Sequence, residues 1–196
     1  MFNPGRGYRN EFRIIGGQWR RRRLGFPDLP GIRPSPDRVR ETLFNWLRDA
    51  LPGAHCLDLF AGSGALGLEA RSRGAAAVLF VDREPQVTET LRAHLAALHA
   101  TSCDVLRSDA LAFLHGPPSV FDIVFLDPPF DSPLLASAAV ALEKGGWLAE
   151  RAHVYMEYPH GARLVLPVGW ELIRESRAGR VGFALVRRSG APLAAG

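Results

Sequence analysis

Lysine, cysteine and long apolar runs are all scarce in this chain of 196 residues. The two cysteines, Cys56 and Cys103, lie inside apolar, strand-like runs, so we expect buried, reduced thiols; a metal site would need more ligands nearby, and none is predicted. No run of 18 apolar residues occurs, which excludes a transmembrane helix on the sequence evidence. The length corresponds to one ordinary domain with room for a small appendage.

The first residues, Met1 to Arg6, lack the apolar core of a secretory signal peptide. With few cysteines and no membrane segment, the chain is expected to be cytoplasmic, without a membrane partner. We also expect a monomer.

Positive charge is concentrated at one end of the chain. Residues 1–48 hold eleven arginines against four acids, a net charge of +7, whereas the remainder has a net charge of −3, which together give +4. A biased composition explains why 23 arginines accompany a single lysine, but it does not explain why the excess lies at one end. The asymmetry favours a polyanionic partner, such as a nucleic acid, for the basic segment.

The basic segment is predicted to contain a β-hairpin. Two extended runs within residues 11–25 flank Gly16 and Gly17, a pair typical of a hairpin turn. We therefore predict a basic N-terminal arm over residues 1–34 and a second domain over residues 35–190. Four consecutive arginines in the second strand would alternate between its two faces; they are Arg20, Arg21, Arg22 and Arg23.

A helix is predicted to open the second domain. Ser35 is suited to be its N-cap and Pro36 its first helical residue. Apolar residues recur on one helical face from Val39 to Leu47, and the helix is expected to end near Asp49.

From residue 55 onward, strand and helix patterns alternate. Continuous apolar strands joined by helices predict an α/β fold with a parallel sheet covered on both faces. The tail differs, because two extended runs around Ala178 and Gly179 predict an antiparallel hairpin at the sheet edge. The expected strands are 55–60, 77–81, 103–107, 121–126, 152–158, 170–176 and 181–187, and the expected helices are 64–73, 85–98, 109–115 and 132–143.

A glycine-rich turn joins the first of these strands to the helix that follows. Gly62 and Gly64 allow the backbone to approach a ligand closely, with Ser63 between them. Asp82 ends the next strand, where its carboxylate could accept both hydroxyls of a ribose. This pattern alone also fits a dinucleotide site.

Two further acids favour S-adenosylmethionine over NAD. Asp58 precedes the glycines, where it could hold an ammonium group and would repel a pyrophosphate. Asp109, followed by Ala110, comes after the strand 103–107, where its carboxylate could accept from an adenine amino group or cap the next helix. An acidic rim suits a ligand that carries both a sulfonium and an ammonium.

A second motif, Asp127-Pro128-Pro129-Phe130, follows an apolar strand. A nucleobase amino group is a poor nucleophile because its lone pair is delocalised into the ring. The Asp127 carboxylate and the Pro128 carbonyl could accept its two N–H protons, while the prolines fix the backbone and Phe130 offers a stacking surface. The motif predicts alkylation of a planar amine, guanine or adenine.

Four segments together resemble one family, the bacterial 16S ribosomal RNA guanine-N2 methyltransferases of the D type. They are 13–20, 33–47, 58–70 and 127–130, and the resemblance extends over about residues 10 to 188. The last two segments occur in many amino-group methyltransferases, whereas the first two are more specific to the family. Two positions depart from its usual pattern: Arg22 stands where glycine is usual, which leaves the local turn open, and Ser35 stands where threonine is usual.

The resemblance implies a Rossmann-like, seven-stranded class I methyltransferase fold, with the last strand antiparallel and the N-terminal hairpin as an extension. It implies S-adenosyl-L-methionine as the donor and one guanine of 16S rRNA, within the assembled small ribosomal subunit, as the acceptor. Asp58, Gly62 and Gly64 would hold the methionine part, Asp82 the ribose, Asp109 the adenine, and the residues from Asp127 to Phe130 the target base. Candidate RNA-binding residues are Arg13, Arg20, Arg21, Arg22, Arg23, Arg33 and Arg38.

Three alternatives remain open at this point. An adenine-N6 methyltransferase acting on RNA or DNA would use the same Asp-Pro-Pro-Phe motif. A non-catalytic RNA-binding assembly protein could share the fold, although intact acids at 58, 82 and 127 argue against it. An NAD-dependent enzyme is disfavoured by Asp58.

Overall fold

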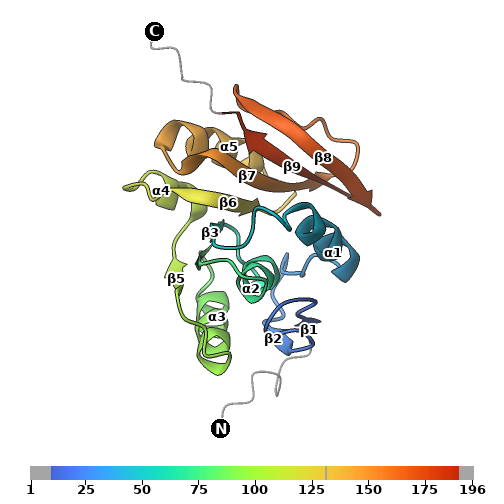
Figure 1. Cartoon of the computed structure of the whole chain (residues 1–196), viewed down its shortest axis with the longest axis vertical. Coiled ribbons are helices and arrows are strands. Elements are labelled where there is room, and N and C mark those ends of the chain that lie inside the picture. Colours follow the sequence, from blue (N-terminus) through green and yellow to red (C-terminus); the bar gives the residue numbers. More distant parts are fainter. Residues whose placement is uncertain (1–9, 131, 190–196) are drawn as a thin grey trace.

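The computed structural model describes residues 10–130 and 132–189 (Figure 1). A short hairpin at the N-terminus precedes a run of alternating strands and helices, and a second hairpin ends the described chain. The strands are β1 (Asn10–Arg13), β2 (Arg23–Phe26), β3 (His55–Asp58), β4 (Ala77–Asp82), β5 (Cys103–Arg107), β6 (Phe121–Leu126), β7 (Leu148–Pro159), β8 (Trp170–Ala178) and β9 (Val181–Arg188). The helices are α1 (Asp37–Trp46), α2 (Ala65–Ser72), α3 (Pro85–Ala97), α4 (Ala110–Leu114) and α5 (Leu134–Gly145).

Seven strands form one sheet in the order β5-β4-β3-β6-β7-β9-β8. The first five of these pair in parallel, as their continuous apolar sequences predicted. β9 pairs antiparallel with both β7 and β8, so the last strand in the chain is the reversed one. The α/β class, the seven-stranded sheet and the antiparallel tail hairpin are therefore confirmed.

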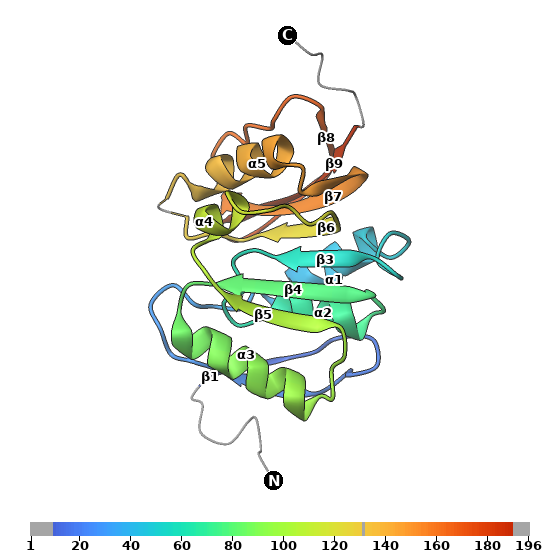
Figure 2. The same ribbon diagram turned by 90° about the vertical axis from the view of Figure 1, so that its left-hand side faces the viewer.

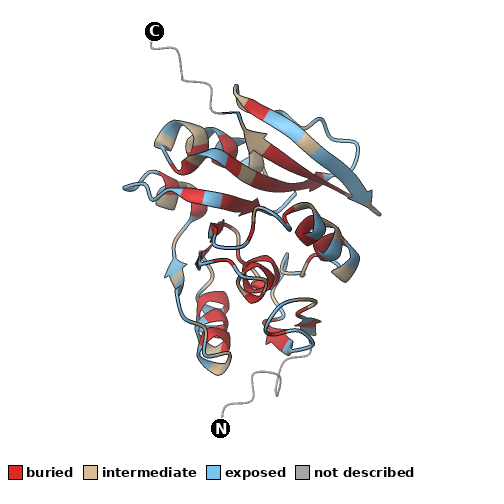
Figure 3. Ribbon diagram, viewed as in Figure 1, coloured by how far each residue is buried: buried red, intermediate tan, exposed pale blue. Residues whose placement is uncertain are grey.

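Helices cover both faces of the sheet (Figure 2). On one face α1, α2, α3 and the N-terminal hairpin share a core with the inward side chains of the strands, where the ring centroids of Phe44 and Phe125 lie 6.1 Å apart. On the other face α4 and α5 pack around Trp147, whose ring centroid lies 4.6 Å from that of Phe113. Figure 3 shows buried residues running along the central strands, while the outer strand β8 is largely exposed.

The N-terminal hairpin exists, but its turn is not the predicted one. β1 and β2 pair from Asn10–Phe26 to Arg13–Arg23, and nine residues, 14–22, join them. Gly16 and Gly17 lie in this connection, not at a tight two-residue turn. A Cβ atom at Gly17 would lie 1.8 Å from the Ser72 carbonyl oxygen, so glycine is required because the connection packs directly on the backbone of α2.

The prediction that Arg20 to Arg22 lie in a strand was wrong. They lie in the turn of the connection, and all three are exposed, as is Arg23 at the start of β2. The left-handed backbone conformation falls at Arg21, with φ of 70°, and not at Arg22, where glycine is usual in the family. All four arginines therefore face solvent, instead of alternating between two faces.

The predicted N-cap of the first helix was also wrong. α1 begins at Asp37, Pro36 occupies the N-cap position, and no side chain caps the helix. The Ser35 hydroxyl instead donates a 2.6 Å hydrogen bond to a carboxylate oxygen of Glu157 in β7. Ser35, which precedes the N-cap residue, therefore contacts a distant strand instead of capping the helix.

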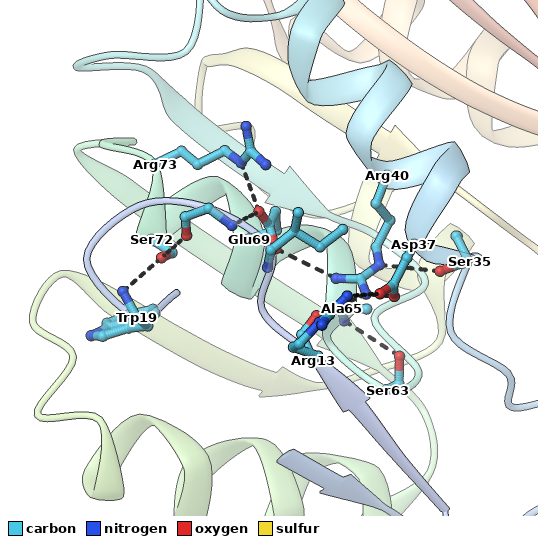
Figure 4. Close-up of polar contacts among 12 residues, drawn as sticks. Arg13, Trp19, Ser35, Asp37, Arg40, Ser63, Ala65, Glu69, Ser72 and Arg73 are labelled. Carbon is cyan, nitrogen blue, oxygen red and sulfur yellow. Dashed lines mark hydrogen bonds and ion pairs between the residues drawn. The ribbon is translucent and has the colours of Figure 1, made fainter. Parts of the chain in front are cut away.

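A buried arginine ties the hairpin to two helices (Figure 4). Arg40 is fully buried, and its guanidinium donates to Asp37 at 2.6 Å, to Glu69 at 3.4 Å, and to the carbonyl oxygens of Arg13 and Ser35 at 2.8 and 3.1 Å. A buried charge with this many partners is costly to leave unpaired, typically by about 3–5 kcal/mol. Arg40 therefore holds the segment from residue 33 to the start of α1 in place.

Glu69 of α2 is the acidic centre of the same network. Its carboxylate accepts from the backbone N–H groups of Ile15 and Gly16, at 2.8 and 2.7 Å, and from Arg73 at 2.6 Å. Because the carboxylate takes two backbone donors from the hairpin connection, that connection is fixed on the helix that follows the glycine loop. The domain boundary between residues 34 and 35 remains a prediction.

Three smaller expectations concern thiols, membranes and metals. Cys56 and Cys103 are both free thiols; Cys56 is buried as expected, whereas Cys103 is only partly buried. No helix among the described residues has the length and hydropathy needed to cross a membrane. Within the same residues, no group of three or more His, Cys, Asp or Glu side chains is placed to hold a metal ion.

Candidate active site

The predicted acids gather at one edge of the sheet because parallel strands end on the same side. Asp58 and Asp82 are the last residues of β3 and β4, and Asp127 follows β6 directly. Asp109 comes two residues after β5 and caps α4. The structure therefore brings together four candidates that are far apart in the sequence.

The glycine loop and Asp58 form one side of this edge. Gly62 and Gly64 have φ of 50° and 77°, a left-handed conformation that suits glycine, and α2 starts directly after them. Asp58 is buried, and its Oδ2 accepts a 2.9 Å hydrogen bond from the backbone N–H of Gly67 in α2. A Cβ atom at Gly67 would lie 2.3 Å from the Phe80 ring and 2.9 Å from Asp58 Oδ2, so this glycine permits the close approach of helix, strand and carboxylate.

Asp82 stabilises the glycine loop, and it lies at the same edge of the sheet as the other acids. Its Oδ2 accepts from the N–H of Gly62 at 2.8 Å, and its Oδ1 accepts from the N–H of Glu84 at 2.9 Å. Each oxygen keeps a second lone pair, which leaves the carboxylate able to accept from a ribose hydroxyl.

The remaining cofactor candidates, Asp109, Ala110 and Ser63, lie at the starts of α4 and α2. Asp109 is exposed and caps α4, with Oδ1 accepting from the N–H groups of Leu111 and Ala112 at 2.9 and 3.0 Å. Ala110 is the buried first residue of that helix. Ser63 is buried, and its hydroxyl oxygen lies 3.4 Å from the N–H of Ala65 (Figure 4).

Asp127 and the residues after it form the other side of the edge. No hydrogen bond to Asp127 is present among the described residues, and this residue is half-buried. Pro128 is buried, which fixes the direction of its carbonyl, while Phe130 is 38% exposed and so has a ring face available for stacking. The Pro129 carbonyl accepts from the Ser132 hydroxyl at 2.6 Å.

Glu157, near the end of β7, completes the acidic edge and was missed from the sequence. Leu126 pairs with Met156 in parallel, so the next residues on each strand, Asp127 and Glu157, are neighbours. Glu157 is only 4% exposed, and its Oε1 accepts from Ser35 at 2.6 Å and from the Tyr155 hydroxyl at 2.8 Å. Glu157 is the single acid in the mostly apolar stretch 152–159 of β7, which was the signal that could have indicated it.

Burial is the largest cause of the raised pKa values of Asp58, Asp127 and Glu157. It raises the pKa of Asp58 to about 7, although the Gly67 N–H opposes the shift. The pKa of Asp127 is raised well above its usual range by burial and then by the charges of Glu157 and Asp58. Burial also raises the pKa of Glu157, against hydrogen bonds from Ser35 and Tyr155. A cationic ligand at this edge would relieve the repulsion.

A cavity of about 260 Å³ opens beside the Asp-Pro-Pro-Phe motif. This volume lies just below the range of roughly 300–1,000 Å³ that is usual for drug-sized ligands, so the cavity suits one planar base better than a whole nucleoside cofactor. Its charged lining residues are Glu157 and Arg163. Its lining also includes Pro128, Pro129, Phe130, Leu135, Tyr158 and Leu164.

The candidate RNA-binding arginines divide into paired and unpaired groups. Arg13 forms an ion pair with Asp37 at 2.9 Å, and Arg23 pairs with Glu11. Five others are exposed, and their side chains make no ion pair within the described residues; they are Arg20, Arg21, Arg22, Arg33 and Arg38. Arg40, which contributed to the +7 of residues 1–48, is buried and internally paired, so it offers no charge to a partner. Residues 1–9 of the predicted arm lie outside the described residues.

The strand order, the glycine loop with its acidic rim and the Asp-Pro-Pro-Phe motif together define a class I methyltransferase fold. Solved structures share it: a putative methyltransferase from Escherichia coli has a TM-score of 0.85 at 46% identity, covering 93% of this chain and 100% of that chain. A putative S-adenosylmethionine-dependent methyltransferase from Streptococcus mutans, 17% identical, shares the fold with a TM-score of 0.65 over 84% of this chain and 51% of that one.

Sequence comparison identifies the family. The model described as "Conserved hypothetical protein 95" matches residues 12–187. The "Ribosomal RNA small subunit methyltransferase D" of Escherichia coli is 47% identical over 96% of both chains, and that of Haemophilus influenzae is 41% identical over 90% of this chain and 94% of its own. The chain belongs to this family of small-subunit ribosomal RNA methyltransferases of the D type.

Proposed function

We propose that this protein transfers the methyl group of S-adenosylmethionine to the exocyclic N2 of one guanine in 16S rRNA, within the small ribosomal subunit. The observation that carries the proposal is the position of Asp127, a half-buried carboxylate without a hydrogen-bond partner among the described residues, directly after β6 and close enough to Asp58 for their charges to interact. An acceptor left free beside a ligand loop is suited to bind an N–H donor that arrives with the substrate. The names of the relatives at 47% and 41% identity support a ribosomal RNA substrate.

The residues present fit S-adenosylmethionine. Gly62 and Gly64 keep the loop free of side chains, and the Asp58 Oδ1 has no hydrogen-bond partner among the described residues. The crowded carboxylates of Asp58 and Asp127 favour a ligand that carries an ammonium and a sulfonium. When bound, the donor supplies an electrophilic methyl group. Asp58 would hold its ammonium, Asp82 its ribose and Asp109 its adenine.

The acceptor side would act mainly by positioning. The Asp127 carboxylate accepts one N2–H and the Pro128 carbonyl accepts the other, so the nitrogen becomes pyramidal and its lone pair points at the methyl group. The N2–C bond forms as the C–S bond breaks and its electron pair stays on sulfur. The cationic amine then loses a proton, first to Asp127 and then to water.

The exposed arginines would bind ribosomal RNA. Arg20, Arg21 and Arg22 project from the connection of the N-terminal hairpin, and Arg33 and Arg38 flank the start of α1. We further propose that the protein acts as a cytoplasmic monomer without a metal ion.

Mass spectrometry of nucleosides from small-subunit RNA tests the function. Cells that lack the protein should lose one N2-methylguanosine, and the wild-type chain should restore it, whereas the Asp127→Ala variant should not. An unchanged N2-methylguanosine content would reject the proposal, and loss of N6-methyladenosine instead would indicate the adenine alternative.

A further inference from the structure

The two carboxylates on the acceptor side form a pair that one base edge can bridge. Asp127 and Glu157 are neighbours at the ends of the parallel strands β6 and β7, one residue beyond the Leu126–Met156 pair. The charge of Glu157 raises the cost of ionising Asp127, as expected for carboxyl groups that lie close together. The other titratable groups that act on this pair are Asp58 and Tyr155.

Glu157 is fixed at one oxygen and available at the other. Its Oε1 accepts from the Ser35 hydroxyl and the Tyr155 hydroxyl, while no hydrogen bond from the described residues reaches Oε2. The side chain is 4% exposed, and Glu157 lines the cavity beside the Asp-Pro-Pro-Phe motif. Among the described residues only His94 Nδ1 is a buried side-chain atom without a partner, so Glu157 Oε2 is not enclosed by protein but open to the cavity, where a ligand can donate to it.

The chemistry of the base edge indicates which donor this is. Guanine presents two adjacent donors, N1–H and the N2 amino group, whereas adenine presents an acceptor at N1 beside its N6 amino group. We propose that Glu157 accepts the N1–H of the target guanine while Asp127 accepts an N2–H, so that the carboxylate pair selects guanine over adenine. This inference rests on the proposed function and adds to it the residue that chooses the base.

Ser35 is a positioning residue in this arrangement. Its hydroxyl holds Oε1 at 2.6 Å, and its own segment is fixed by the bond from Arg40 to the Ser35 carbonyl (Figure 4). Because two hydroxyl groups donate to Oε1, the Glu157 carboxylate is held in place and Oε2 is the oxygen left for the base. The basic segment around residue 33 and the base-selecting carboxylate are therefore joined through one side chain.

The test compares two target bases that differ in whether N1 donates or accepts a hydrogen bond. Small ribosomal subunits are reconstituted with 16S rRNA that carries either guanosine or 2-aminoadenosine at the target position. Both bases have the N2 amine, but 2-aminoadenosine has an acceptor at N1. At mildly alkaline pH, which favours the ionised carboxylates and keeps N1 of guanosine protonated, the wild type should prefer guanosine by kcat/KM by roughly a hundredfold or more, as sites built around one hydrogen-bond pattern do.

The Glu157→Gln variant should change that preference. Its amide can donate to N1 of 2-aminoadenosine, so the ratio of kcat/KM values for guanosine over 2-aminoadenosine should fall at least about tenfold relative to wild type. The Ser35→Ala variant should lower the ratio in the same direction by less. An unchanged ratio in Glu157→Gln would overturn the inference.

The controls separate this inference from folding and from the proposed function. Glu171→Gln removes a carboxylate from β8 that pairs with Arg187 outside the site, and its ratio should equal that of wild type. Thermal unfolding and S-adenosylmethionine binding of Glu157→Gln report whether the fold and donor site persist; the ratio itself is independent of the active fraction. If wild type methylates neither substrate, the proposed function fails; if it methylates guanosine but the ratio is insensitive to Glu157→Gln, only the base-selection role fails.

Discussion

The proposed donor side of the site and its proposed acceptor side use their carboxylates differently. On the donor side, Asp58, Asp82 and Asp109 each accept hydrogen bonds from nearby backbone N–H groups. On the acceptor side, Asp127 has no partner among the described residues, and Glu157 has partners at one oxygen only. Both groups of acids lie at the carboxyl edge of the same sheet.

This difference follows from what each side must bind. Asp58 and Asp82 hold the glycine loop and the helix that follows it, and Asp109 caps α4, so loss of any of them should disturb local structure as well as the proposed ligand contact. Under the proposed function, Asp127 leaves both oxygens free for the target base and Glu157 leaves one, so loss of Asp127 should affect the reaction and little else. Substitutions on the two sides can therefore be told apart by separate measurements of binding, turnover and stability.

The largest effect is expected for turnover in Asp127→Ala. Removing one positioned group that stabilises developing charge typically costs about 2.7–4 kcal/mol, or roughly 10²–10³ in kcat. Tritium transfer from labelled S-adenosylmethionine to purified small subunits measures it. Asp122→Asn, at the exposed opposite end of β6, keeps an acceptor for the His55 N–H, serves as the control and should retain wild-type turnover; activity of Asp127→Ala within a few-fold of that control would mean that Asp127 does not hold the acceptor amine.

Asp82→Ala should weaken the binding of S-adenosylmethionine. A lost hydrogen bond to a charged group corresponds to about 1.5–3 kcal/mol, or roughly a ten- to hundredfold rise in Kd. Part of that rise comes from loosening Gly62, whose N–H loses its acceptor. Calorimetric titration against Asp104→Ala, an exposed acid on β5, gives the comparison. A Kd equal to that of the control would mean that another residue, such as Glu84, holds the ribose.

The free energy of unfolding should vary with pH because burial raises the pKa of Asp58. Its pKa is about 7 in the folded chain and ~4 in the unfolded chain, so the folded state retains a proton that the unfolded state has released between these values. Stability contributed by this group is therefore present below pH ~4 and is lost as pH rises toward about 7.

The Asp58→Asn variant cannot ionise but can still accept from the Gly67 N–H. Without ligand it should be more stable than wild type at neutral pH, by a few kcal/mol at most, since one pKa unit corresponds to ~1.4 kcal/mol. The difference in the free energy of unfolding should disappear below pH ~4. Urea denaturation across this pH range checks it; a difference that does not vary with pH would contradict the raised pKa.

The smallest effect is expected for the exposed arginines of the hairpin connection. Changing Arg20, Arg21 and Arg22 to Ser should weaken subunit binding and reduce the salt slope by about one unit for each phosphate that these side chains neutralise. The control removes the same charge from the other end of the molecule, at Arg174, Arg177 and Arg180. Equal slopes for the two triple variants would mean that the hairpin arginines do not bind RNA. Donor binding should not change in either variant.

Much of the fold and the donor side could be predicted because local patterns encode them. Apolar runs indicated the strands, and glycines with a distal acid indicated the loop. The hairpin connection could not be predicted, because Gly17 is required by the backbone of α2, a contact across 55 positions of sequence. Ser35 was misassigned for a similar reason: a serine before a helix usually caps it, but here its hydroxyl bonds Glu157, which is 122 residues away. Glu157 itself becomes visible only when the strand register places it beside Asp127.

The dissociation constant of S-adenosylmethionine for the Asp127→Ala variant tests the separation of donor and acceptor sides most directly. Because Asp127 is proposed to contact the amine and makes no hydrogen bond to the glycine loop, calorimetry should give a Kd within about threefold of wild type, even though turnover is lost. A rise as large as that of Asp82→Ala would contradict the account, since it would place Asp127 on the donor side of the site.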